Sequence, residues 1–157
     1  MKLTSTDFQH EGNIPTRFTC EGEDISPQLG WSDLPKNTAS LALIVDDPDV
    51  PDPAKPRRTW VHWVLYNLPP QASGLTEANT HANLPPGARE GLNDWERTGY
   101  GGPCPPIGCH RYMHKLYALD TVLQDLNQPT KAQLETAMRG HVLAEALLIG
   151  MYEKINK

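Results

Sequence analysis

The density of backbone breakers is the feature that most restricts the fold of this chain. Fifteen prolines and twelve glycines are spread over 157 residues. Proline removes a backbone donor and fixes φ, and glycine weakens regular structure, so long helices have little room between them. What remains is a series of short apolar segments separated by turn signals, the pattern of an antiparallel β domain.

Four of these apolar segments are predicted strands, because each is rich in β-branched, aromatic or leucine residues. They cover residues 41–46, 59–67, 110–119 and 144–153, with a weaker candidate at 14–20. Segment 59–67 is apolar on both of its alternating faces. This pattern predicts a central strand that is covered on two sides, and therefore a fold of two layers.

One helix is predicted near residues 130–140. Thr130 is a suitable N-cap, Gln133 occupies the capping-box position three residues later, and Gly140 can end the helix. Leu134 and Met138 recur at helical spacing between them.

Residues 68–109, in contrast, contain too many prolines and glycines for regular structure, and an ordered loop of this length usually serves a site. No internal repeat, low-complexity tract or linker divides the sequence, which predicts a single domain over residues 1–157.

Composition narrows the classes of function. The formal net charge is −5, so no global positive field exists to attract nucleic acid. The one basic cluster is Lys55, Arg57 and Arg58, which favours a solvated loop or a contact with a phosphorylated partner. The polar N-terminus and the absence of an 18-residue apolar run predict a cytoplasmic protein without stable membrane association.

The three cysteines are an odd number in a chain too large to need disulfide staples. This pattern predicts free thiols in a reducing compartment.

The first candidate site is the acidic, proline-rich segment 46–53, which directly follows an apolar strand. Its prolines fix φ, so the carboxylates are held rather than mobile. An acidic surface turn is the ordinary interpretation, and a calcium loop is the alternative. A loop numbered from Asp47 places Pro51 where a side-chain ligand is required and Arg58 where the bidentate glutamate belongs, which excludes an EF-hand.

The second and third candidates contain histidines. His62 lies in an aromatic-rich strand, where a lone histidine is more often a core residue. His110 and Tyr112 follow a glycine- and proline-rich loop, and their spacing of two places both on one face of a strand, as a site for an oxyanion requires. His110 and His114 are about 13 Å apart on a strand, too far to share a metal ion.

Four of these motifs together resemble one known family. The stretches DPDVP, VHW, GPCPPIGCHRY and LYALD occur in this order at residues 47–51, 61–63, 102–112 and 116–120. They are similar to the phosphatidylethanolamine-binding protein family, especially its bacterial Raf kinase inhibitor-like branch. The resemblance implies an all-β fold with a large antiparallel sheet, a smaller sheet packed against it, and a few peripheral helices, including the one near 130–140.

The resemblance also implies a pocket in which the DPDVP acids meet the two histidines and bind a phosphate, a phosphorylated ligand or a phospholipid headgroup. Position by position, it nominates nine ligand-binding residues and no catalytic residue, metal ligand or cofactor. The nine are Asp47, Asp49, Trp60, His62, Tyr100, Gly102, Pro105, His110 and Tyr112.

A carboxylate in an anion site needs a partner, since unpaired it repels phosphate. We hypothesise that Asp47 accepts a hydrogen bond from His62 or His110, raises the pKa of that ring and leaves its other N–H for the ligand. Anion affinity is then highest below the histidine pKa and declines as the pH rises through it.

The expected function is that of a non-enzymatic binding protein that modulates a kinase or protease partner, with a homodimer left open. A phospholipid-headgroup carrier and a hydrolase that uses the same pocket are the alternatives. The sequence contains no GxSxG elbow, phosphate-binding P-loop or HExxH motif, which favours binding over catalysis.

Overall fold

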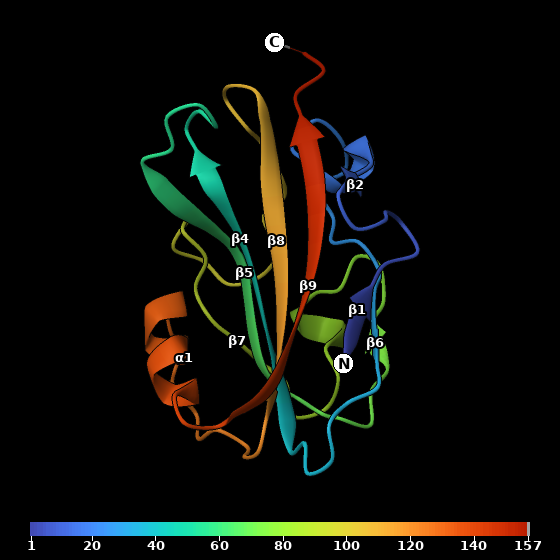
Figure 1. Ribbon diagram of the computed structural model, residues 1–157, viewed down its shortest axis with the longest axis vertical. Coiled ribbons are helices and arrows are strands. Elements are labelled where there is room, and N and C mark those ends of the chain that lie inside the picture. Colours follow the sequence, from blue (N-terminus) through green and yellow to red (C-terminus); the bar gives the residue numbers. More distant parts are fainter. Residues whose placement is uncertain (157) are drawn as a thin grey trace.

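A computed structural model describes residues 1–156 and shows a β-rich protein with one α-helix (Figure 1). Four of its strands are long and belong to one sheet, and two of these four lie in the middle of that sheet. The strands are β1 (Lys2–Thr4), β2 (Gly12–Asn13), β3 (Leu29–Ser32), β4 (Ser40–Val50), β5 (Arg58–Leu68), β6 (Gly74–Leu75), β7 (Arg89–Glu90), β8 (Cys109–Leu119) and β9 (Val142–Glu153). The helices are the 3₁₀ turns η1 (Thr16–Phe18) and η2 (His81–Asn83) and the α-helix α1 (Lys131–Met138).

The large sheet has six strands in the order β2-β9-β8-β4-β5-β7. All of its long pairs are antiparallel, and β2 alone joins in parallel, through Gly12 and Asn13 at the edge of β9. β4 and β8 lie in the middle, so the predicted strands 41–46 and 110–119 form the centre of the sheet. The prediction of a large antiparallel sheet is confirmed, apart from this short parallel edge.

The small sheet has the order β1-β3-β6 and covers one face of the large sheet. Apolar side chains from both sheets form the main core between them, including Leu3, Trp31 and Leu75 from the small sheet and Leu43 and Trp63 from the large one. We call the side of the large sheet that packs on this core the inner face. The predicted two-layer arrangement is confirmed.

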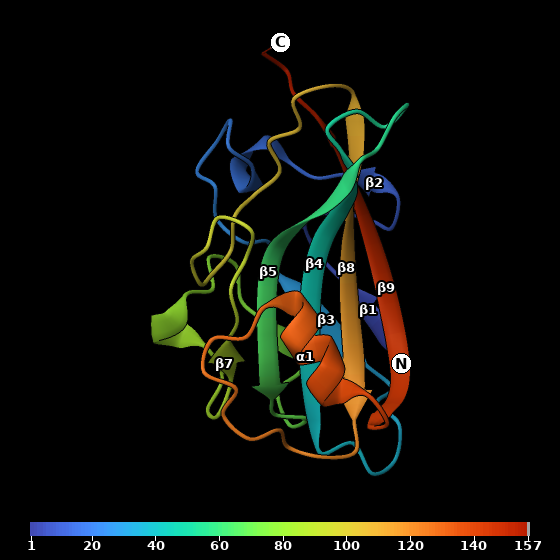
Figure 2. The same ribbon diagram turned by 90° about the vertical axis from the view of Figure 1, so that its left-hand side faces the viewer.

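The opposite side, the outer face, is covered in part by α1, which lies in front of β4 and β5 in Figure 2. Leu134 and Met138 of the helix pack on Ala42 and Ile44 of β4. The predicted capping box is present, because Thr130 accepts a hydrogen bond from the Gln133 backbone and the Gln133 side chain accepts one from the Thr130 backbone.

Two expectations from the sequence are wrong. Residues 14–20 contain the 3₁₀ turn η1 instead of a strand, because the carbonyl of Pro15 accepts the Phe18 N–H and turns the chain. The cysteines are not all free, since Cys20 and Cys104 form a disulfide across 84 residues, and Cys109 remains a free, exposed thiol. Within residues 1–156, no helix has the length and apolar character needed to cross a membrane.

Candidate functional site

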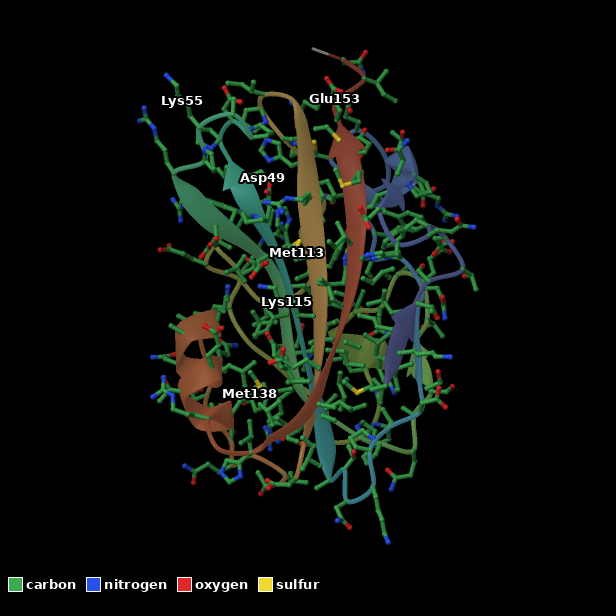
Figure 3. The ribbon with its side chains drawn as sticks, viewed as in Figure 1. Asp49, Lys55, Met113, Lys115, Met138 and Glu153 are labelled. Carbon is green, nitrogen blue, oxygen red and sulfur yellow. A yellow bond between two sulfur atoms is a disulfide. The ribbon has the colours of Figure 1, made fainter. Side chains whose placement is uncertain are left out.

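A cavity of about 210 Å³ lies at one end of the large sheet, on the inner face. The end of β4, the start of β5 and the glycine- and proline-rich loop that leads into β8 form most of its wall, and Trp95 completes it. Figure 3 shows this end of the molecule, where Asp49 lies near the end of β4 and Lys55 on the hairpin beyond it. The lining residues are Asp47, Val50, Trp60, His62, Trp95, Cys104, Pro105, Pro106 and Tyr112.

Asp47, which lines the cavity, forms a buried pair with His110, which lies behind the wall. The Asp47 carboxylate oxygen Oδ2 lies 2.6 Å from His110 Nδ1, and its other oxygen accepts the Asp49 backbone N–H at 2.8 Å. His110 is fully buried, and its Nε2 lies 2.8 Å from the Ile107 carbonyl. The prediction that Asp47 orients a histidine is therefore confirmed for His110, but the prediction that the other N–H of that ring faces a ligand is wrong.

This geometry determines the net charge of the pair. A carbonyl oxygen can only accept, so His110 Nε2 carries a proton, and one further proton is shared between Nδ1 and Asp47. The pair is then a carboxylate with an imidazolium, or a carboxylic acid with a neutral imidazole. Both forms have a net charge of zero. Burial raises the pKa of Asp47, while the hydrogen bond from His110 opposes that shift.

Asp49 does not reach the cavity. Its carboxylate binds Arg111 through Nε at 3.0 Å and Nη2 at 2.8 Å, and it also accepts the Arg111 backbone N–H at 2.9 Å. These hydrogen bonds hold the pKa of Asp49 below its usual range. Asp49 therefore joins the end of β4 to the start of β8, and its backbone N–H supports Asp47.

His62 lies in the wall of the cavity and is held by glycine. Its Nδ1 lies 2.7 Å from the Gly101 carbonyl, and the Gly101 N–H donates to the His62 carbonyl at 3.1 Å. A side chain at position 101 would collide with the Trp95 ring, which packs edge-on against His62. Burial lowers the pKa of His62 to about 4, so the ring is neutral at pH 7 and its Nε2 is an acceptor.

Two buried donors of the cavity wall have no hydrogen-bond partner among residues 1–156. They are the Tyr112 hydroxyl and the Trp60 indole Nε1–H. A buried polar group without a partner costs about 1–3 kcal/mol, so an unsatisfied pair in one cavity requires an explanation. Burial raises the pKa of Tyr112, which keeps the hydroxyl protonated and able to donate.

The structure places five of the nine predicted site residues on the cavity: Asp47, Trp60, His62, Pro105 and Tyr112. His110 and Asp49 support the wall from behind, as described above. Tyr100 and Gly102 lie outside, because the Tyr100 hydroxyl donates to the Phe18 carbonyl and the Gly102 N–H donates to Asp24. The ligand-binding role of all nine residues remains a prediction.

Sequence analysis missed Trp95 and the role of Cys104. Trp95 contacts both Trp60 and His62, at ring-centroid distances of 5.5 and 5.1 Å, and closes one side of the cavity. Its only local signal is an Asn-Asp-Trp turn, in which Asn93 Oδ1 accepts the Trp95 N–H. Cys104 lines the cavity while bonded to Cys20, so the disulfide fastens the loop wall to the N-terminal segment.

The site has donors for a small anion but no cluster for a metal. Within residues 1–156, no group of three or more His, Cys, Asp or Glu side chains could hold a metal ion. His114 does not approach His110 for this purpose, since its Nδ1 lies 3.0 Å from the Tyr112 carbonyl and 3.2 Å from the Leu148 carbonyl.

The fold and the cavity define a class: a two-sheet β protein with a cavity at one end of its large sheet. A family model described as phosphatidylethanolamine-binding protein matches residues 4–153 of this chain. A UPF0098 protein of Methanothermobacter thermautotrophicus is 49% identical over 155 residues, which cover 98% of this chain and 99% of the relative.

Solved structures agree with the sequence comparison. The crystal structure of a phosphatidylethanolamine-binding protein homologue, CT736 from Chlamydia trachomatis, is 46% identical with a TM-score of 0.89, covering 98% of this chain and 97% of that one. The crystal structure of YbcL from E. coli is 31% identical with a TM-score of 0.87, covering 98% of both chains. The chain belongs to the phosphatidylethanolamine-binding protein family.

Proposed function

We propose that this chain is a non-enzymatic binding protein whose cavity holds a small anion, such as a phosphate or a phosphorylated group. The observation that carries the proposal is that two residues lining one cavity, Tyr112 and Trp60, each have a buried donor without a partner within residues 1–156: the Tyr112 hydroxyl and the Trp60 indole N–H. An oxyanion that accepts from both would satisfy them at once. A hydrogen bond to a charged group is worth about 1.5–3 kcal/mol, more than one between neutral groups.

The electrostatics of the cavity support an anion. The Asp47–His110 pair is neutral in both of its forms, and the Asp47 oxygens already accept from His110 and from the Asp49 backbone. The carboxylate therefore does not present a free negative charge to the ligand. In this proposal Asp47 is a positioning residue that shapes the wall.

Binding is favoured over catalysis by the state of the groups that line the cavity. Cys104 is held in a disulfide, and the Tyr112 hydroxyl is kept protonated by burial, so neither lining residue is an activated nucleophile. The further expectation, that the protein modulates a kinase or protease, is proposed on family resemblance alone. A phosphatidylethanolamine headgroup carries the same phosphate chemistry and could also be the physiological source of the anion.

The test is a calorimetric titration of inorganic phosphate at pH 7 into the intact protein and into Tyr112→Phe, which removes only the unpartnered hydroxyl. We expect phosphate affinity to fall about tenfold or more, without loss of stability, because the hydroxyl has no other bond to lose. Tyr100→Phe is the matched control, since its hydroxyl binds Phe18 outside the cavity and its loss should leave affinity unchanged.

Absence of phosphate binding by the intact protein, or equal affinity in Tyr112→Phe, would refute the anion pocket. Sedimentation with vesicles of phosphatidylethanolamine and phosphatidylcholine separates the two sources of the ligand. Vesicle binding that free phosphate displaces would identify a lipid headgroup, and phosphate binding without vesicle binding would identify a soluble ligand.

A further inference from the structure

Among residues 1–156, no lysine or arginine lines the proposed cavity. The Asp47–His110 pair is neutral overall, and burial keeps His62 neutral at pH 7. A phosphate monoester carries about −1.5 to −2 charges at neutral pH. The countercharge for such a ligand must therefore come from the rim of the cavity.

Arg58 is the cation at this rim. Arg58, Trp60 and His62 occupy alternate positions of β5 and therefore share one face of the strand. The guanidinium carbon of Arg58 lies 4.7 Å from the centre of the Trp60 ring, and in the strand register Arg58 is the partner of Val50. Trp60 and Val50, the two neighbours of Arg58, both line the cavity.

The charge of Arg58 is only weakly compensated. Its one ion pair within residues 1–156 is with Asp94 at 3.9 Å, and that carboxylate oxygen already accepts the Val61 N–H at 2.7 Å. The Arg58 side chain is 55% exposed. The same hairpin carries Lys55 and Arg57, which form no ion pair within residues 1–156, and Asp52, whose Oδ1 accepts the Ala54 N–H at 2.9 Å.

The size of the cavity is consistent with a ligand that extends toward this rim. The cavity has a volume of about 210 Å³. A single tetrahedral oxyanion is smaller than that. A ligand that fills the cavity would therefore extend beyond an oxyanion bound to Tyr112 and Trp60, and the Arg58 guanidinium lies over the Trp60 ring.

We propose that Arg58 is a specificity-determining residue that binds a second anionic group of the ligand. The ligand class is a small molecule with two adjacent anionic groups, such as a diphosphate, in which one group enters the cavity and the other meets the planar guanidinium. Two parallel N–H donors of arginine match one phosphate group. This inference rests on the proposed anion pocket and adds the selection of its ligand.

The experiment compares inorganic phosphate and pyrophosphate as probes, by calorimetry at fixed ionic strength and pH 7. The intact protein should bind pyrophosphate more tightly than phosphate. In Arg58→Gln, we expect pyrophosphate affinity to fall about tenfold or more and phosphate affinity to fall less than about threefold. Arg58→Lys keeps the positive charge but loses the two parallel N–H donors. Its affinity for pyrophosphate should lie between that of the intact protein and that of Arg58→Gln.

Arg97→Gln is the matched control. Arg97 is also stacked on a tryptophan of the cavity wall, at 5.7 Å from the Trp95 ring, but it lines a separate cavity with Asp24 and Asn79. In Arg97→Gln, the affinities for phosphate and for pyrophosphate should both stay within about twofold of those of the intact protein.

The two proposals fail in different ways. An intact protein that binds neither probe refutes the anion pocket, and the role of Arg58 with it. Binding of both probes with the same preference in Arg58→Gln refutes only the role of Arg58 and leaves the pocket standing. An equal loss for phosphate and pyrophosphate also refutes it, since Arg58 would then act as a general countercharge without selecting a second group.

Discussion

Two adjacent aspartates of β4 lie on opposite faces of the large sheet and have different partners. Asp47 points to the inner face, where it pairs with the fully buried His110 beside the cavity. Asp46 points to the outer face, where one carboxylate oxygen binds Lys115 at 2.9 Å and Lys131 at 2.6 Å. Figure 3 shows Lys115 on the outer side of β8.

The difference between the two pairs lies in access to water. The side chains of Lys115 and Lys131 are 29% and 21% exposed, so each ammonium can reach solvent without Asp46. His110 has no such access, and both of its ring nitrogens depend on protein partners. These two neighbouring aspartates therefore have different roles. Asp46 connects α1 to the sheet through Lys131, and Asp47 supports the wall of the cavity.

Replacing each aspartate by alanine tests this distinction, and the largest effect is expected at Asp47. Asp47→Ala removes one partner of a buried pair and should lower the free energy of unfolding by about 3–5 kcal/mol. Asp46→Ala should change it by no more than about 1 kcal/mol, because its lysines can be solvated and its Oδ1 has no partner within residues 1–156. Urea denaturation with an unchanged m-value measures both, and equal losses would contradict the distinction.

The second prediction concerns how the free energy of unfolding depends on pH because His62 is buried. Burial lowers the pKa of His62 to about 4 in the folded state, from an ordinary value near 6.5. Between these values the unfolded chain binds a proton that the folded chain does not, so stability falls as the pH decreases from about 6.5 to about 4 and then levels off. The full contribution of His62 is about 3 kcal/mol.

His62→Gln isolates this contribution, because every other titrating group is common to both proteins. Unfolding free energies measured from pH 4 to 7.5 should show a shallower slope in the variant. His114→Gln is a parallel case, since burial lowers the pKa of His114 to about 4 as well. Identical slopes for His62→Gln and the intact protein would show that His62 is not held neutral.

The fold was predictable because its signals are local. The segments at 41–46 and 110–119 are apolar enough to indicate strands, and Thr130 and Gln133 define the start of a helix by their spacing alone. The strand at β4 runs further than predicted, to Val50, because partners on β5 and β8 hold acidic residues that otherwise indicate a turn. The contacts of β4 with its neighbouring strands, and not the strand propensity of its own residues, extend it to Val50.

The site was predictable only in part, because its decisive relations join distant segments. Sequence reasoning placed Asp47 beside a histidine but left His62 and His110 as alternatives, and only the fold distinguishes them. The Cys20–Cys104 bond joins residues 84 positions apart, which no spacing rule identifies from three cysteines. Trp95 enters the cavity from a loop whose path the sequence does not indicate.

The smallest expected effect lies on the outer face, at the cap of α1. Thr130→Ala removes the hydroxyl that accepts the Gln133 backbone N–H at 3.2 Å and should cost about 1 kcal/mol of stability. Thr130→Ser keeps an acceptor at the cap and should differ from the intact protein by about 0.5 kcal/mol at most. Phosphate affinity should be unchanged in both variants, because α1 packs on the face opposite to the cavity. A loss of phosphate affinity in Thr130→Ala would mean that the two faces of the sheet are coupled.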